Sequence, residues 1–116
     1  MGVLDPAAMD GMREMVGGDD EFLADLIDTF LKDAPQMLSD MRQALKTGDA
    51  AVLRRIAHSL KSNSASFGAM ALGELCRELE MIGKANLLDG ADELITRADT
   101  EFIRVQAALE TLRQGL

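Results

Sequence analysis

Apolar residues recur every three or four positions along most of this chain, which is the period of helices with one buried face. The pattern predicts a short helix that opens at Asp5-Pro6, an N-cap residue followed by a proline, and ends at Gly17-Gly18. A long helix follows, capped by Asp19 or Asp20, and its apolar face continues as far as Leu45. Few β-branched residues interrupt these patterns, so helix is favoured throughout.

The later apolar positions predict three more helices. The first covers about residues 50–67, the second about residues 70–82, and the third follows a turn in which Asp89 can act as the N-cap. The turn Thr47-Gly48-Asp49 is too short for anything but an antiparallel neighbour. Gly68 is expected to end its helix in the left-handed conformation.

These elements together predict an all-α fold, an antiparallel four-helix bundle with a short N-terminal helix covering one end. The length of 116 residues fits one domain. Residues 1–18 would form the short N-terminal helix and its turn, and residues 19–116 the bundle. Aromatic residues make up only 3% of the chain, so we expect an aliphatic core to which several of the 8 methionines contribute.

Three local features have more than one interpretation. Pro35 lies inside the long helical pattern and predicts a kink or a brief break near residues 32–34. The methionines of the N-terminal helix could form a flexible lid on the core or a soft surface for a partner. Cys76 lies in the middle of an apolar stripe, which favours a buried, inert thiol over a redox site.

The only histidine, His58, is predicted to lie on the polar side of its helix. At about 100° per residue, and with Leu53 at the centre of the buried face, His58 falls at roughly 140°. Its neighbours on that side are small or basic: Ala51, Arg54, Arg55, Lys61, Ser62 and Ala65. A single exposed histidine on a helix is usually ordinary surface, so the neighbours decide its interpretation.

Those neighbours favour a chemical role. Lys61 lies one turn further on, so its ammonium can reach a group carried by the imidazole. Ser62 and Ala65 are small, which leaves room for another protein close to the ring. The strip is basic, although the whole chain has a formal net charge of −8. A nucleophilic nitrogen, a nearby cation and open access suit the capture of an anionic group such as phosphoryl.

The same residues resemble a known signature, that of histidine-containing phosphotransfer (HPt) domains. The resemblance is carried by Ala57-His58-Ser59-Leu60-Lys61-Ser62, Phe67-Gly68-Ala69, Leu72, Leu75-Cys76 and Leu79-Glu80. It extends over nearly the whole chain, but the flanking helices are less specific than this central motif. One departure is visible, because many members of the family have glycine where this chain has Ser62, and serine is nearly as small.

The resemblance implies a phosphoryl carrier in a multistep phosphorelay of a two-component system. His58 would accept phosphoryl from the phospho-aspartate of a receiver domain and pass it to another receiver, and Lys61 would offset the phosphoryl charge. Residues that could contact a docked partner are Arg54, Arg55, Ser62, Ala65 and Glu80. Glu80 occupies the family position that can face the histidine from the adjacent helix, with an ordinary flanking carboxylate as the alternative.

The expected partners are receiver domains of response regulators and a hybrid sensor histidine kinase. The receiver would supply Mg²⁺ and most catalytic groups, so this chain is expected to need no cofactor and to have no kinase or phosphatase machinery. It has no Gly-rich phosphate loop, and no Cys or His pair at metal-ligand spacing. The alternative hypothesis is an adaptor bundle of the same signalling systems that binds a partner and never carries phosphate.

Charge and targeting signals limit the remaining possibilities. The net charge of −8 argues against nucleic acid and anionic membrane surfaces as partners. We find no signal peptide or spanning apolar run, and the single cysteine fits a reducing compartment, so a cytoplasmic monomer is expected. The sequence does not identify the donor kinase or the acceptor regulator, nor whether the domain stands alone or belongs to a hybrid kinase.

Overall fold

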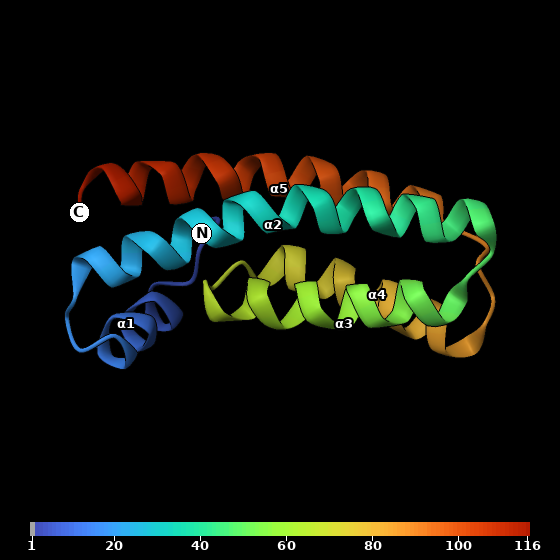
Figure 1. Ribbon diagram of the computed structural model, residues 1–116, viewed down its shortest axis with the longest axis horizontal. Helices are drawn as coiled ribbons and strands as arrows, with labels where there is room; N and C mark the ends of the chain where they lie inside the picture. The colour runs from blue at the N-terminus through green and yellow to red at the C-terminus, as the bar shows by residue number, and fades with distance from the viewer. Residues whose placement is uncertain (1) are drawn as a thin grey trace.

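The computed structural model describes residues 2–116, and in this range it contains five helices and no strand. Their bounds are Pro6–Met15 (α1), Asp20–Thr47 (α2), Ala50–Ser66 (α3), Met70–Ala85 (α4) and Ala91–Gln114 (α5). Helices α2 to α5 form the bundle: each packs against the next, and α5 returns to α2 (Figure 1). The predicted antiparallel four-helix bundle with a short N-terminal helix at one end is therefore confirmed.

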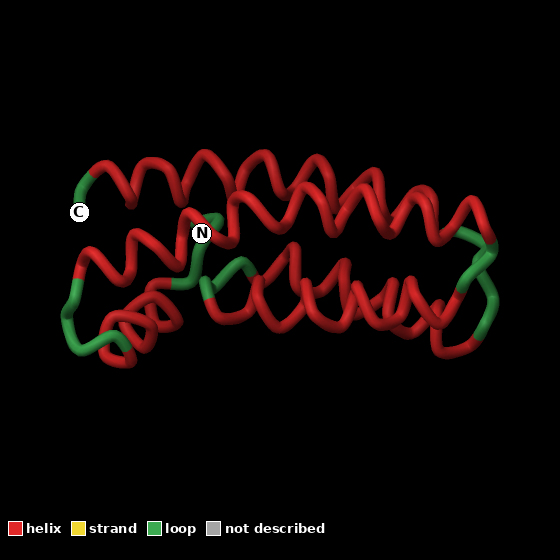
Figure 2. Tube along the Cα trace, viewed as in Figure 1, coloured by secondary structure: helices red, strands yellow, loops and turns green. Residues whose placement is uncertain are grey.

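Short turns connect these helices (Figure 2). Three helices begin at an aspartate whose side chain accepts a backbone N–H of the first turn, at 3.0–3.1 Å: Asp5 for α1, Asp19 for α2 and Asp49 for α3. Gly48 ends α2 with a φ of 71°, in the left-handed region that glycine adopts without strain. The predicted starts of these three helices are confirmed.

Two helix ends differ from the prediction. Helix α5 is preceded by Gly90 with a φ of 84° and has no side-chain cap, so the expectation that Asp89 caps it was wrong. The left-handed glycine turns the chain directly into the buried Ala91, which leaves Asp89 one residue too early to cap. Helix α4 continues to Ala85, three residues beyond the expected end, and stops at Asn86 in the left-handed conformation.

Helix α2 also departs from the prediction in two places. Of the kink or brief break expected near residues 32–34, the break is absent: α2 runs through Pro35, since a single lost backbone hydrogen bond is tolerated while Ala34 and Leu38 stay buried on the core face. Phe22, which the pattern placed on that face, is 53% exposed. The next residue, Leu23, takes the inward position in the first turn and is fully buried.

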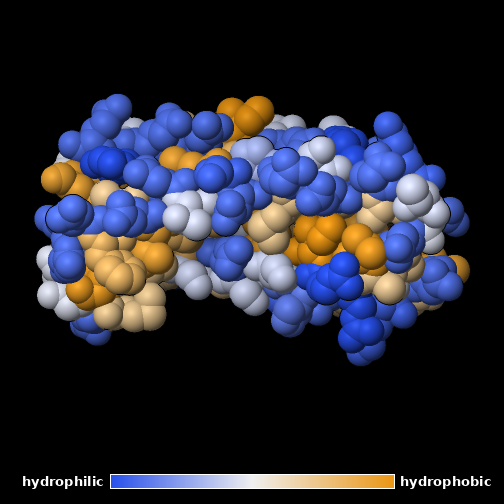
Figure 3. All heavy atoms as spheres, in the orientation of Figure 1, coloured by the Kyte–Doolittle hydropathy of each residue, from blue (hydrophilic) through white to orange (hydrophobic). Residues whose placement is uncertain are grey.

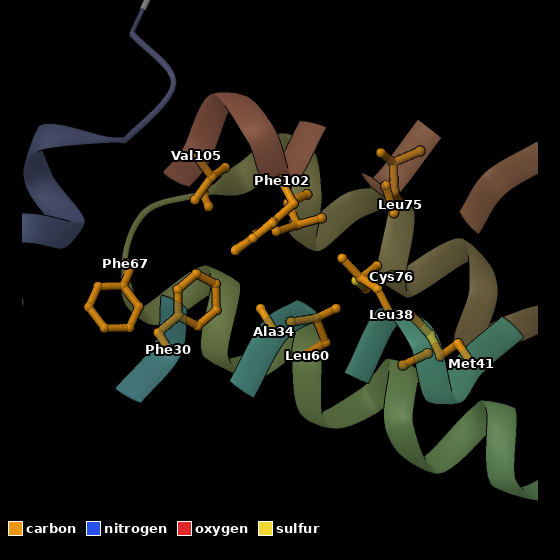
Figure 4. Packing of buried hydrophobic residues seen from close by; sticks show 14 of the residues in the cluster. Phe30, Ala34, Leu38, Met41, Leu60, Phe67, Leu75, Cys76, Phe102 and Val105 are labelled. Atoms are coloured by element: carbon orange, nitrogen blue, oxygen red, sulfur yellow. The ribbon is translucent and has the colours of Figure 1, made fainter. Parts of the chain in front are cut away.

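The core is a continuous apolar cluster along the bundle axis, drawn close by in Figure 4. At one end three phenylalanines meet: the ring of Phe30 lies 4.9 Å from that of Phe67 and 6.0 Å from that of Phe102. Cys76 is buried further along, and this burial raises the pKa of its thiol to about 12. The expected burial of Cys76 is confirmed, and the raised pKa favours the thiol form over the reactive thiolate.

Helix α1 closes the end of the bundle beside the last turn of α3. The backbone N–H of Asp5 donates to the carbonyl oxygen of Gly68 at 2.8 Å. Gly68 has a φ of 75°, and a Cβ at this position would lie 2.7 Å from the nitrogen of Asp5, so both its conformation and its neighbours require glycine. Met9 and Met12 are buried in the core, which favours the lid interpretation of this helix.

Helices α3 and α4 approach closely, and this positions the candidate site. Gly83 of α4 lies directly over α3, where a Cβ would come within 2.9 Å of the Ala50 carbonyl oxygen and of the Arg54 nitrogen. Further along, Gly73 packs near Ser64, which is fully buried and donates a hydrogen bond from Oγ to the Leu60 carbonyl at 2.7 Å. The glycines of α4 thus permit the close packing of α4 against α3.

Candidate functional site

His58 lies on the solvent side of α3, and its side chain is 61% exposed. Two nearby residues on the opposite face of the helix, Ala57 and Leu60, are fully buried. Their burial fixes the rotation of α3 about its own axis, so the imidazole is directed away from the bundle. The prediction that the single histidine stands in water is confirmed.

Glu80 of α4 connects His58 to Lys61. One carboxylate oxygen, Oε2, lies 2.8 Å from His58 Nδ1, and the other, Oε1, accepts a hydrogen bond from Lys61 Nζ at 2.6 Å. The Glu80 side chain is only 19% exposed, because the close packing of α3 on α4 shields it. Of the two interpretations of Glu80, the structure supports the one in which it faces the histidine.

This arrangement fixes the hydrogen-bonding role of each imidazole nitrogen. The hydrogen bond from Lys61, and then that from His58, lower the pKa of Glu80, while partial desolvation opposes the shift. Glu80 is therefore an ionised, acceptor-only carboxylate at neutral pH. Its neighbour Nδ1 must then carry a proton, which leaves Nε2 of the neutral ring with a free lone pair.

The other predicted site residues lie on both sides of His58 along α3. Arg54 and Arg55 are exposed and make no side-chain hydrogen bond or ion pair with other residues of the range 2–116. They line a hollow that is open to solvent, together with His58. Ser62 and Ala65 are exposed on the opposite, C-terminal side of His58 and do not line this hollow.

Sequence reasoning missed part of this geometry. Ser59, which the helical period directs about 100° away from His58, nevertheless borders the same hollow. The role of Gly83 in bringing the two helices together was not recognised either. The predicted helix ended at about residue 82, so Gly83 was assigned to the following turn, whereas it lies inside α4.

Two further tests concern metals and membranes. Within residues 2–116, no group of three or more His, Cys, Asp or Glu side chains is arranged to hold a metal ion. None of the helices in the same range is both long enough and apolar enough to span a bilayer.

Comparison with known proteins identifies the family. The sequence model of the Hpt domain matches residues 25–115, most of the chain. The chain belongs to the Hpt domain family. The match includes His58, Lys61 and Glu80, and it leaves α1 and the start of α2 outside.

Relatives of this Hpt domain occur in bacteria, yeast and plants. The crystal structure of histidine-containing phosphotransfer protein B from Pseudomonas aeruginosa PAO1 is 32% identical in sequence and superposes with a TM-score of 0.90, covering 98% of this chain and 96% of that one. Multistep phosphorelay regulator 1 of Schizosaccharomyces pombe is 26% identical over 93 residues. Histidine-containing phosphotransfer protein 2 of Arabidopsis thaliana is 24% identical over 98 residues.

The extent of these matches differs between the relatives. The alignments cover 79% and 82% of this chain, but only 32% of the yeast protein and 63% of the plant protein. This Hpt domain therefore spans about a third and just under two thirds of these two relatives, whereas it matches the Pseudomonas structure almost from end to end.

Proposed function

We propose that this chain performs histidine phosphotransfer in a multistep phosphorelay, with His58 as the residue that accepts the phosphoryl group. Membership of the Hpt domain family supports the activity. The observation that carries the assignment to His58 is its contact with Glu80, because this contact leaves Nε2 of an exposed ring free to act as a nucleophile. No other imidazole is present in the chain.

The proposed transfer step needs no base to remove a proton, because the attacking nitrogen carries none. The Nε2 lone pair forms a bond to phosphorus, the bond from phosphorus to the aspartyl oxygen of the receiver breaks, and that oxygen leaves as a carboxylate with the electron pair. The ring becomes cationic as the bond forms. Its Nδ1–H points at the Glu80 carboxylate, which compensates this charge, and transfer to a second receiver reverses the same step.

Lys61 is proposed to offset phosphoryl charge, and the surface around His58 to dock the receiver. Ser62 and Ala65 keep the C-terminal side of the ring accessible. Apolar surface lies beyond them, near α1: Met15 is 72% exposed and Phe22 53% exposed. Figure 3 shows apolar side chains over α1 and along the seam between α2 and α3. The proposed docking face for the receiver combines the basic and small residues around His58 with the exposed apolar residues near α1.

The finer parts of the proposal concern partners and setting. The expected partners are receiver domains and a hybrid sensor histidine kinase, with Mg²⁺ bound by the receiver and no cofactor in this chain. A monomeric carrier in the cytoplasm, with no kinase or phosphatase activity of its own, completes the proposal. The alternative, an adaptor that never carries phosphate, is disfavoured because a scaffold needs neither a free Nε2 nor the Glu80 contact that leaves it free.

One experiment tests the proposal directly. The chain is incubated with a phosphorylated receiver domain, and the phosphate that it gains is examined for the acid lability and base stability of phosphohistidine. We expect such phosphate on the wild type and none on His58→Gln, which should keep its helical circular dichroism because substitutions of exposed residues usually change stability by less than about 0.5 kcal/mol. Phosphate on the variant, or none on a folded wild type with several receivers, would contradict the proposal.

A further inference from the structure

We propose that Arg54 and Arg55 hold the phosphoryl group on His58, and thereby set how much phosphoryl this chain retains at equilibrium. The inference rests on the proposed function and deepens it. It assigns to these two residues a role beyond partner docking, for which the sequence alone made them candidates. Three observations carry it: the direction of the imidazole, the hollow beside it, and the distribution of charge.

The imidazole lines the same hollow as the two arginines, which Lys61 and Ser62 do not line. Side chains of an α-helix tilt toward its N-terminus, so a residue covers the turn that precedes it. For His58 that turn carries Arg54 at i−4 and Arg55 at i−3, whereas Lys61 and Ser62 lie on the following turn. A group on Nε2 is therefore expected to lie nearer to Arg54 and Arg55 than to Lys61 and Ser62.

The hollow on this side is large enough for a phosphoryl group. It has a volume of about 340 Å³ and is open to solvent. Its lining consists of Ala51, Arg54, Arg55, His58, Ser59 and Glu80. Small side chains, alanine and serine, separate the charged ones, so oxygens on a phosphorylated His58 can reach the guanidinium groups without displacing bulky neighbours.

The charges around the hollow favour an anion. Its only carboxylate, Glu80, is already bonded to Lys61 Nζ at 2.6 Å and to His58 Nδ1 at 2.8 Å. Lys61 is therefore partly compensated in the unphosphorylated chain. Arg54 and Arg55 form no ion pair within residues 2–116, so they are the uncompensated cations of the site. A guanidinium also presents the planar fork of donors that matches phosphoryl oxygens.

A contact with the phosphoryl group differs from a contact with a docked partner in its thermodynamic effect. The equilibrium between free phosphorylated receiver and free phosphorylated carrier depends only on the separated proteins. Docking contacts therefore change the rate of transfer in both directions and leave this equilibrium constant unchanged. Contacts from arginine N–H groups to the phosphoryl oxygens stabilise the phosphorylated carrier, so they raise the constant.

The test measures this constant for the wild type and for Arg54→Ala, Arg55→Ala and the double variant. Dilute phosphorylated receiver is mixed with each carrier, and both phosphorylated species are quantified at equilibrium. We expect a fall of about threefold for each single variant and about tenfold for the double variant, with a smaller salt dependence than in the wild type. Arg97→Ala is the matched control, because Arg97 is exposed on α5, which does not contact α3 in the described chain.

The outcomes separate this inference from the proposed function. An equilibrium constant that stays unchanged in the double variant, with slower transfer in both directions, assigns the arginines to docking alone and overturns the inference. A wild-type chain that gains no phosphate overturns the proposed function instead. Alanine keeps the Cβ of Arg54 against α4, so the variants should fold, and the double glutamine variant gives the same comparison if helical content is lost.

Discussion

Glu80 is one carboxylate that binds two donors, the imidazole of His58 and the ammonium group of Lys61, and this decides what a phosphoryl group would meet at the site. Its two oxygens are divided between His58 and Lys61 at 2.8 and 2.6 Å. A phosphoryl group on the ring competes with Glu80 for Lys61, while the cationic phosphorylated ring strengthens its own bond to Glu80. The site can thus accept two negative charges by redistributing contacts that already exist.

Lys61→Ala should slow phosphoryl transfer without abolishing it. At about 5 Å, and at an effective dielectric between that of water and that of a protein surface, one unit charge pair is worth roughly 1–3 kcal/mol. The expected loss of rate is about fivefold to a hundredfold, and the nucleophile remains. Transfer from a phosphorylated receiver is measured at two ionic strengths, and added salt should slow the wild type more than the variant. An unchanged rate would reduce Lys61 to a surface charge.

Glu80→Gln tests the carboxylate separately from its hydrogen-bonding shape. Glutamine still offers an oxygen to Nδ1 but no charge, so we expect transfer to slow by about fivefold, from the loss of roughly 1 kcal/mol of stabilisation of the cationic ring. Alanine at the same position should slow it further. The rate of transfer checks both variants, and equal rates for wild type and glutamine variant would remove the electrostatic part of the argument.

The wild type and Glu80→Gln should also differ in how their free energy of unfolding depends on pH. The pKa of Glu80 lies below its ordinary value in the folded chain, so the carboxylate stabilises the fold above the unfolded pKa, and this contribution is lost as the pH falls through the folded pKa. We expect the wild type to lose up to about 1 kcal/mol more than Glu80→Gln on acidification below pH 5. Urea unfolding at several pH values gives the comparison.

At the scale of single residues, the sequence predicted orientation well and long-range contacts poorly. The exposure of His58 followed from the period of one helix, because Leu53, Ala57 and Leu60 fix its buried face. The contact of Glu80 with His58 depends on how far α4 is displaced along α3, and no local pattern encodes that displacement. It was available only as an open alternative until the packing of the two helices was known.

At the scale of helices, Gly83 sets the distance between α3 and α4. A Cβ there would lie 2.9 Å from backbone atoms of α3, which cannot move aside as a flexible side chain would. Gly83→Ala should therefore lower the free energy of unfolding by about 1–3 kcal/mol, although alanine is the better helix former. The displaced α4 should also carry Glu80 away from His58 and slow transfer.

The matched control for this change is Gly11→Ala. Gly11 also lies inside a helix, but a Cβ on it would meet nothing within 4 Å. This variant should gain about 0.5–1 kcal/mol from the lower backbone entropy of alanine. Urea denaturation gives the free energy of unfolding of both variants. Similar values for Gly83→Ala and Gly11→Ala would mean that α4 relaxes around the new methyl group.

The ends of the helices show what local sequence can and cannot specify. The sequence predicted caps at Asp5, which a proline follows, and at Asp19 or Asp20, and the carboxylates of Asp5 and Asp19 do accept first-turn N–H groups. Asp89 offered the same signal and was wrong, since Gly90 supplied a left-handed turn closer to the buried Ala91.

At the scale of the whole molecule, the bundle is an elongated rod of 43 × 23 × 20 Å, and the proposed docking face covers only part of it. Ser62→Gln should block transfer from a receiver and leave the fold intact, because Ser62 points into solvent one turn beyond His58. Phosphorylation by a small phosphodonor, if it occurs, should survive better. Ser39→Gln is the control, since this exposed serine borders the groove between α2 and α5. Equal losses with both donors would argue against a steric effect.

The cluster of phenylalanines beneath α1 has a consequence for spectroscopy. The chain has no tryptophan or tyrosine, and three of its four phenylalanines, Phe30, Phe67 and Phe102, meet at one end of the bundle. The fourth, Phe22, is half exposed and contributes little chiral signal. Near-ultraviolet circular dichroism therefore reads the packing of that end alone, while far-ultraviolet dichroism averages over all helices. A lid that opens before the bundle melts would be visible as two transitions at different temperatures.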